Sequence, residues 1–154
     1  MFRGGRPDER LEILLLHRSP GRILAGMWQC VSGSLEAGER VVAGALRELR
    51  EETGYDAATI EGLYSLDQVN QFHEPSYDAI LTAAIFAVRV RSGTDPVMSA
   101  EHDSIQWVTP REALEIVVWP AYRESIRRIE ADLLDVGRSA WFRLELDGSR
   151  RSPG

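Results

Sequence analysis

The most informative stretch of this chain begins with Gly33-Ser34-Leu35-Glu36-Ala37-Gly38-Glu39, continues through residues 40–46, and ends with Arg47-Glu48-Leu49-Arg50-Glu51-Glu52-Thr53-Gly54-Tyr55. Between Arg40 and Thr53 there is no proline, and apolar residues recur three or four positions apart, which predicts an amphipathic helix. These apolar residues are Val42, Ala45, Leu46 and Leu49. Gly54 follows where a helix commonly ends in a left-handed residue, so we expect the helix to stop there.

Three acidic residues crowd one face of this predicted helix. Glu48, Glu51 and Glu52 stand at positions i, i+3 and i+4, where like charges destabilise a helix by a few tenths of a kcal/mol per pair. They also lie in its C-terminal half, where the helix dipole disfavours anions. A divalent cation would turn this repulsion into attraction, and Mg²⁺ prefers such oxygen ligands. The loop 33–38, with its two glycines, can bring backbone carbonyls to the same ion.

The same acids also have a simpler interpretation, as a solvated face of the helix. Arg47 and Arg50 belong to the same stretch and could pair with them, each pair contributing little because it would be exposed. From the three glutamates alone, a metal site and a solvated acidic face agree equally well with the sequence. The remainder of the stretch favours the metal site.

The whole stretch resembles the signature of the Nudix hydrolase family, Gly-x5-Glu-x7-Arg-Glu-U-x-Glu-Glu-x-Gly-U, in which U is a bulky apolar residue. Its positions are matched, in order, by Gly33, Glu39, Arg47, Glu48, Leu49, Glu51, Glu52 and Gly54. Tyr55 fills the last U and is bulky but not aliphatic, which is a minor departure. The resemblance implies the Nudix fold, an α/β (α+β) domain with a mixed β-sheet sandwiched between α-helices.

The resemblance also implies a reaction and a set of roles. Nudix hydrolases cleave a nucleoside diphosphate linked to another group, with Mg²⁺ or Mn²⁺ as the metal. The metal ligands that it implies are the carbonyl of Ser32 and the side chains of Glu48, Glu51 and Glu52. Of these, Glu51 would bind a second ion or join Glu52 in the network that activates water. The residues that it implies as structural support of the site are Gly33, Glu39, Arg47 and Gly54, with Arg47 and Glu39 forming a charge-assisted pair.

Many Nudix enzymes place a general base outside the signature, on a loop before a late strand. Here Glu101 precedes the strand predicted at 104–108, which makes it the candidate base or additional metal ligand. Its simpler interpretation is an exposed loop acid. The catalytic candidates are therefore Glu51, Glu52 and Glu101.

A narrower resemblance concerns the substrate. Residues 28–36 and 68–72, together with Glu101 and His102, are similar to the dihydroneopterin triphosphate pyrophosphatase subgroup. This implies release of pyrophosphate from a nucleoside or pterin triphosphate, leaving a monophosphate. Two alternatives stay open: another nucleoside diphosphate derivative (ADP-ribose, a dinucleotide polyphosphate or an oxidised nucleotide), and a Nudix module that binds a nucleotide without cleaving it.

Three aromatic residues are candidates for binding the ring of such a substrate. Trp28, Phe72 and Tyr77 could each stack on a heterocycle, since aromatic faces attract flat rings. The alternative is ordinary packing in the hydrophobic core, and for Trp28 and Phe72 this is the favoured interpretation.

Other patterns predict the remaining elements. Strands are expected at 11–16, 28–31, 63–66, 79–90, 104–108 and, at an edge, 141–146, with an irregular segment at 70–77. Pro110 and Pro120 are expected in the first turns of two helices, the second with Ile126, Ile129 and Leu133 on its apolar face. We expect a single domain at residues 1–147, followed by a flexible tail at 148–154.

Composition excludes several classes of protein. The 154 residues are 44% hydrophobic and 27% charged, as expected of one soluble domain. A net charge of −6 argues against binding of long nucleic acids, and no apolar run is long enough to span a membrane. The single cysteine, Cys30, excludes an intrachain disulfide and agrees with a cytoplasmic location. The expected partner is a small triphosphate, and a homodimer is compatible with the sequence.

Overall fold

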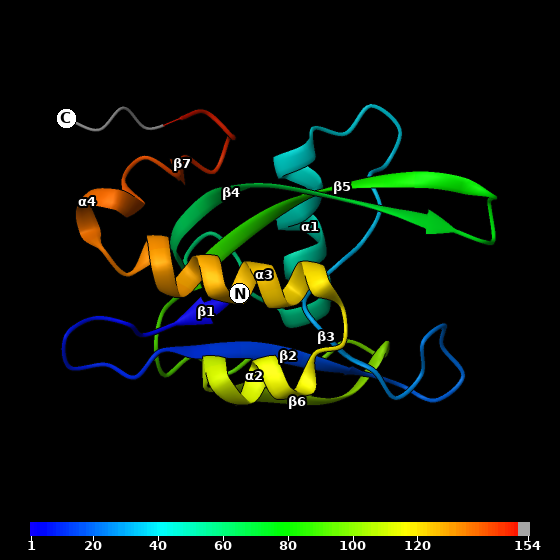
Figure 1. The fold of residues 1–154 in the computed structure, drawn as a ribbon, viewed down its shortest axis with the longest axis horizontal. Helices are drawn as coiled ribbons and strands as arrows, with labels where there is room; N and C mark the ends of the chain where they lie inside the picture. Colours follow the sequence, from blue (N-terminus) through cyan, green and yellow to red (C-terminus); the bar gives the residue numbers. More distant parts are fainter. Residues whose placement is uncertain (151–154) are drawn as a thin grey trace.

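The protein is a mixed β-sheet with helices on both faces, in a computed structural model that describes residues 1–150 (Figure 1). The strands are β1 (Phe2–Arg3), β2 (Glu12–Arg18), β3 (Trp28–Gln29), β4 (Ile60–Glu74), β5 (Ala79–Val90), β6 (His102–Val108) and β7 (Arg143–Leu144). The helices are α1 (Val41–Thr53), α2 (Pro110–Ile116), α3 (Pro120–Arg128), the π-helical turn η1 (Ile129–Leu133) and α4 (Val136–Ser139). This arrangement confirms the fold class predicted from the sequence.

Strand β2 organises the sheet. It pairs with β6 along one edge, and with β1 and then β3 along the other. Strand β1 continues the sheet through a parallel pairing with β5, which pairs antiparallel with β4, and β4 with β7. Because β1 and β3 leave the same edge of β2 at different points, the sheet divides there.

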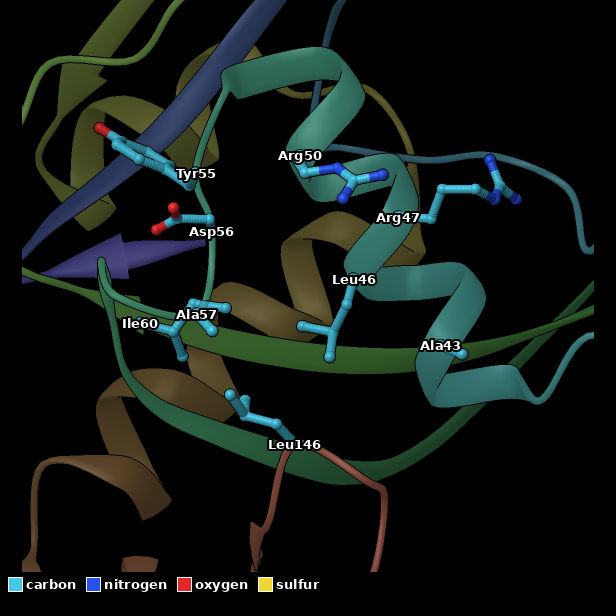
Figure 2. A pocket seen from close by; sticks show the side chains of 9 residues that line it. All are labelled: Ala43, Leu46, Arg47, Arg50, Tyr55, Asp56, Ala57, Ile60 and Leu146. Atoms are coloured by element: carbon cyan, nitrogen blue, oxygen red, sulfur yellow. The ribbon is translucent and has the colours of Figure 1, made fainter.

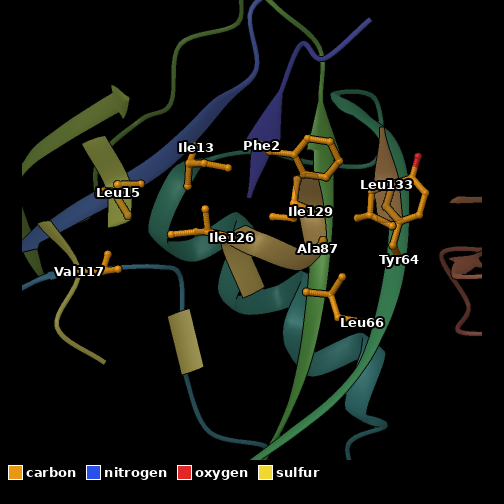
Figure 3. Packing of buried hydrophobic residues seen from close by; sticks show 11 residues of the cluster. Phe2, Ile13, Leu15, Tyr64, Leu66, Ala87, Val117, Ile126, Ile129 and Leu133 are labelled. Atoms are coloured by element: carbon orange, nitrogen blue, oxygen red, sulfur yellow. The ribbon is translucent and has the colours of Figure 1, made fainter. Parts of the chain in front are cut away.

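Side chains of β2 alternate between two hydrophobic layers. Ile13 and Leu15 pack in one cluster with residues of α3 and η1, as Figure 3 shows, and with Ala113 of α2. Leu14 and Leu16 pack on the opposite face, against Leu49 of α1 and its neighbours. All four β2 residues are at most 1% exposed, so the predicted buried strand is confirmed. This two-sided burial holds α1 firmly against the sheet.

The helices after β6 begin as predicted. Pro110 and Pro120 occupy their first turns, and a capping box between Thr109 and Glu112 closes the start of α2. The predicted apolar face continues from α3 into η1 through Ile126, Ile129 and Leu133, all buried. Within residues 1–150, no helix is long and apolar enough to cross a membrane.

The ribbon of β4 and β5 corrects one prediction. The sequence suggests an irregular segment at 70–77, whereas β4 continues to Glu74 and stays paired with β5 as far as Ala79. The pairing shifts register between Ser65 and Gln68, where Asp67 has a φ of 46°. The ribbon then extends beyond the helices (Figure 1), so its polar residues can form a strand without an apolar face to bury.

The end of the described chain is still hydrogen-bonded. The amide of Gly148 donates to the carbonyl of Glu145, and the amide of Glu145 donates to that of Ser149, both at 2.9 Å. Leu144 also forms a bridge with Arg150. The first part of the predicted tail at 148–154 is therefore a turn, and residues 151–154 lie outside the described residues.

Candidate functional site

Helix α1 ends as its sequence predicts. Gly54 takes a φ of 71°, and its amide donates to the carbonyl of Arg50 at 2.8 Å. A Cβ at Gly54 would lie 3.1 Å from the Cβ of Val97, so the position is also tightly packed. The glycine lets the chain turn away directly after Glu52.

Arg47 connects the loop before α1 to the helix. Its Nε and Nη2 donate to the two oxygens of Glu39, each at 3.0 Å, and Nη2 also donates to the carbonyl of Ser34 at 2.9 Å. The hydrogen bond from Arg47 lowers the pKa of Glu39. Nη1 reaches Glu48 at 2.9 Å and Glu51 at 3.2 Å. The expected pair of Arg47 and Glu39 is therefore present, within a larger cluster.

Glu52 is the acidic residue with the most unfavourable surroundings. It is only 5% exposed, and its Oε2 has no hydrogen-bond partner. Burial raises the pKa of Glu52 to about 8, and the negative charges of Glu48 and Glu101 add to this effect. The backbone amide of Ser32 acts in the opposite direction by favouring the charged form. A buried carboxyl group with an unused oxygen is what a cation would stabilise.

Gly33 leaves room for the carboxylate of Glu48. A Cβ at Gly33 would lie only 1.9 Å from the Cδ of Glu48. No side chain can therefore occupy this position unless the carboxylate moves. Steric fit thus explains why the motif has glycine at this position, because only glycine leaves space for the carboxylate of Glu48 between the loop and the helix.

Glu101 is brought close to this group from a distant part of the chain. It lies directly before β6, and the Nη1 of Arg18 donates to its Oε2 at 3.0 Å. The amide of Ser19 donates to its carbonyl, also at 3.0 Å. The amide of Ser99, two residues before Glu101, donates to the carbonyl of Glu52 at 3.4 Å, so this loop lies against the end of α1. The negative charge of Glu101 adds to the rise in the pKa of Glu52. Glu101 is therefore a partly exposed loop acid that lies near Glu52, and its role as base or metal ligand stays a prediction.

The carboxylate oxygens of these acids are suitable ligands for a divalent ion, although the side chains do not converge on one position. Within residues 1–150, no three His, Cys, Asp or Glu side chains stand in an arrangement that could hold a metal ion. Arg47 draws Glu48 and Glu51 to one side, and Arg18 holds Glu101. The unpartnered oxygen of Glu52 and the space that Gly33 leaves for Glu48 nevertheless suit a cation with oxygen ligands.

Two residues near the site were not predicted from the sequence. Tyr122 of α3 lies close to the side chain of Ser32, and burial raises the pKa of its hydroxyl to about 12. Arg18 lies at the end of β2 and holds Glu101. Neither residue belongs to a motif, and only the packing of α3 and β2 brings them to the signature.

The aromatic candidates do not gather in one place. Trp28 packs against the core, with its ring 4.8 Å from that of His17. Phe72 is 43% exposed and Tyr77 75% exposed on the ribbon of β4 and β5, so core packing is wrong for Phe72. Among the residues described, no hydrogen bond or ring contact joins these aromatic side chains to Glu52. Their part in binding a ring stays a prediction.

We expect Gly33→Ala to weaken Mg²⁺ binding by about tenfold while the protein still folds. The added methyl group must displace the carboxylate of Glu48, and the carboxylate can move because it ends a flexible side chain. Isothermal titration calorimetry with Mg²⁺ measures the affinity. Gly38→Ala is a steric control, because no atom lies within 4 Å of a Cβ there, although its φ of 78° adds backbone strain. Wild-type affinity in Gly33→Ala would contradict the placement of Glu48 at the ion.

Comparison with known families gives a clear match. A family model described as "NUDIX domain" matches residues 5–129, which include α1, Glu101 and most of the sheet. The matched region covers every element that positions the acidic cluster.

Similar proteins extend this result. An octanoyltransferase of Myxococcus xanthus is 36% identical over 133 residues, which cover 85% of this chain but only 35% of that protein. CTP pyrophosphohydrolase of Escherichia coli is 28% identical over 118 residues, 71% of this chain and 76% of that protein. The structure of the dihydroneopterin triphosphate pyrophosphohydrolase of E. coli is similar with a TM-score of 0.66 and 23% identity, covering 82% of this chain and 89% of that chain. This last likeness concerns the fold alone.

Proposed function

Since the chain belongs to the Nudix family, we propose that it hydrolyses a phosphoanhydride bond of a nucleoside triphosphate, releasing pyrophosphate and a monophosphate. The observation that carries the proposal is the buried carboxyl group of Glu52, with one oxygen unpartnered and two further acids beside it. The similarity to CTP pyrophosphohydrolase supports a triphosphate as the substrate. Nudix hydrolases generally use a divalent metal, and we propose Mg²⁺, with Mn²⁺ as a substitute.

The signature supplies the residues that would hold this ion. We assign Glu48, Glu52 and the carbonyl of Ser32 as ligands, with Glu51 as a ligand to a second ion. When bound, the metal would neutralise charge on the phosphoryl oxygens and lower the pKa of a bound water. Arg47 orients Glu48 and Glu51 from behind, through its bonds to both carboxylates.

Glu101 would act as the general base. It accepts a proton from water as the water oxygen forms a bond to phosphorus, and the anhydride bond breaks with its electron pair leaving on pyrophosphate. Arg18 holds Glu101 through one oxygen, Oε2. The acids Glu51 and Glu52 would complete the network around this water.

The proposal also concerns which ring system the triphosphate substrate carries. A pterin triphosphate is a second candidate, because residues 28–36 resemble the corresponding subgroup. Trp28 is the aromatic candidate nearest in sequence to the proposed ligands, since it begins β3 and lies four residues before Ser32, and its ring also packs against the core. The exposed rings of Phe72 and Tyr77 would contact a ring only if the substrate reached the ribbon of β4 and β5.

A substrate panel tests this function directly. Purified protein with Mg²⁺ is incubated with nucleoside triphosphates, a pterin triphosphate, ADP-ribose, a dinucleotide polyphosphate and an oxidised nucleotide, and products are resolved by chromatography. We expect pyrophosphate and a monophosphate from a triphosphate, with turnover lost when the metal is chelated. Cleavage of only ADP-ribose or a dinucleotide would replace the proposed substrate. Binding of nucleotides without any cleavage would overturn the catalytic proposal in favour of a binding module.

A further inference from the structure

A cavity of about 510 Å³ lies against the side of α1 opposite to the acidic cluster. At 100° per residue, the positions of Ala43, Leu46 and Arg50 lie about half a turn around the helix from those of Glu48 and Glu52. The cavity and the proposed metal site therefore lie on opposite sides of the same helix, with Arg47 at the border between them. Its size falls within the range of small-molecule sites.

The walls of this cavity are largely apolar. Figure 2 shows Leu46 of α1, Ile60 of β4 and Leu146 around one space, with Ala57 beside Ile60. Leu146 is 39% exposed, although it lies next to other apolar side chains. An apolar surface of this kind gains free energy when a ligand removes it from water.

Arg50 provides an uncommitted positive charge at the cavity. Its side chain forms no hydrogen bond or ion pair with any residue between 1 and 150, in contrast to that of Arg47. Arg47 also lines the cavity but points away from Leu46 (Figure 2), towards its bonds with Glu39 and Glu48.

The acidic residue that lines the cavity, Asp56, is already hydrogen-bonded within its own turn. Asp56 accepts hydrogen bonds from the amides of Ala58 and Thr59 and from the Thr59 hydroxyl. These bonds lower the pKa of Asp56. The carboxylate of Asp56 is therefore held within its own turn and forms no salt bridge with the guanidinium of Arg50.

We propose that this cavity binds a small amphipathic organic anion, with its apolar body against Leu46, Ile60 and Leu146 and its anionic group on Arg50. An apolar surface with few polar groups favours hydrophobic ligands, and the guanidinium selects carboxylate, sulfonate or phosphate over a neutral group. This ligand differs from the proposed substrate, whose several phosphates require the acidic face and its metal. The proposal does not depend on the catalytic activity.

The probe for this site is 8-anilinonaphthalene-1-sulfonate, whose fluorescence rises when its rings leave water. We expect saturable binding with a Kd of roughly tens of micromolar, from the affinity per atom usual for ligands of this size. Amide resonances of ¹⁵N-labelled protein should shift mainly at residues 43–60 and around Leu146. Binding without saturation, or shifts concentrated elsewhere, would overturn the proposal.

A charge reversal with a matched control tests the role of Arg50. Arg50→Glu should weaken binding of the probe at least tenfold, whereas Arg127→Glu should not, because Arg127 is an exposed basic residue in the last turn of a different helix, α3. In wild-type protein, N-phenyl-1-naphthylamine, which lacks the sulfonate, should bind at least tenfold more weakly than the probe. Equal affinities of the two compounds, or of Arg50→Glu and wild type for the probe, would show that no anion is recognised here.

Discussion

Glu52→Gln is expected to lower kcat by about a thousand-fold while the fold persists. Glutamine has nearly the same shape as the neutral carboxyl group that the folded protein favours at this buried position. It carries no charge for a divalent ion, so the oxygen left unpartnered in the wild type loses its proposed use. The variant should still bind nucleotide weakly with Mg²⁺, because the other proposed ligands, Glu48, Glu51 and the carbonyl of Ser32, are unchanged.

Steady-state kinetics on the triphosphate identified by the substrate panel measure this loss. Circular dichroism reports whether the variant is folded, and calorimetry with Mg²⁺ reports whether it still takes up the ion. Glu130→Gln is the control, because Glu130 is exposed in η1. Activity of Glu52→Gln within a few-fold of this control would show that Glu52 is not a ligand.

The same substitution has an expected effect on stability without metal. Burial and the charges of Glu48 and Glu101 raise the pKa of Glu52 from 4.5 to about 8. Between these two values the unfolded chain releases the proton that the folded chain keeps, so the free energy of unfolding falls as the pH rises. In the presence of a chelator, the Tm of Glu52→Gln should therefore be higher than that of the wild type at pH 8. At pH 4.5 the two Tm values should be equal. A constant difference in Tm across this range would contradict the role of burial.

Arg47→Met is the second large effect, an expected fall of several degrees in Tm and of about 100-fold in kcat. Methionine keeps much of the apolar stem but removes every bond to Ser34, Glu39, Glu48 and Glu51. The side chains of Glu39 and Glu48 are only 15% and 18% exposed, so water screens their mutual repulsion poorly. The loop before α1 should therefore lose its connection to the helix, and Glu48 and Glu51 should lose their orientation.

Thermal unfolding and steady-state kinetics check this expectation against two further variants. Arg111→Met removes an exposed pair with Glu115 and should change neither quantity appreciably. Arg47→Lys keeps the charge but not the planar fork that reaches both oxygens of Glu39, so its losses should be intermediate. An Arg47→Met protein that behaves like Arg111→Met would show that the cluster is incidental.

Local spacing was sufficient to predict the helix, and the family resemblance supplied the main ion pair. The apolar repeat before Gly54 predicts α1, and the resemblance implies the pair of Glu39 and Arg47 that the structure forms. These features depend on residues close in sequence, where periodicity and reach are nearly fixed. The buried strand β2 was equally predictable, because its residues are apolar without interruption.

Contacts between distant residues were less accessible. No local pattern indicates that Tyr122 reaches Ser32, or that Arg18 holds Glu101 across 83 positions of sequence. The polar half of β4 also differs from the predicted irregular segment at 70–77, because a strand without a buried face has no apolar alternation. There the hydrogen bonds to β5 stabilise the strand, and they leave no apolar pattern in the sequence.

The alternation of side chains along β2 has a consequence for which sequence changes the protein can accept. Ile13 and Leu15 face one hydrophobic layer and Leu14 and Leu16 the other. Deleting one residue within the strand would move the side chains after the deletion to the opposite face and also turn Arg18 away from Glu101. Insertions and deletions should therefore be confined to the connections around β2, while the length of the strand itself stays invariant.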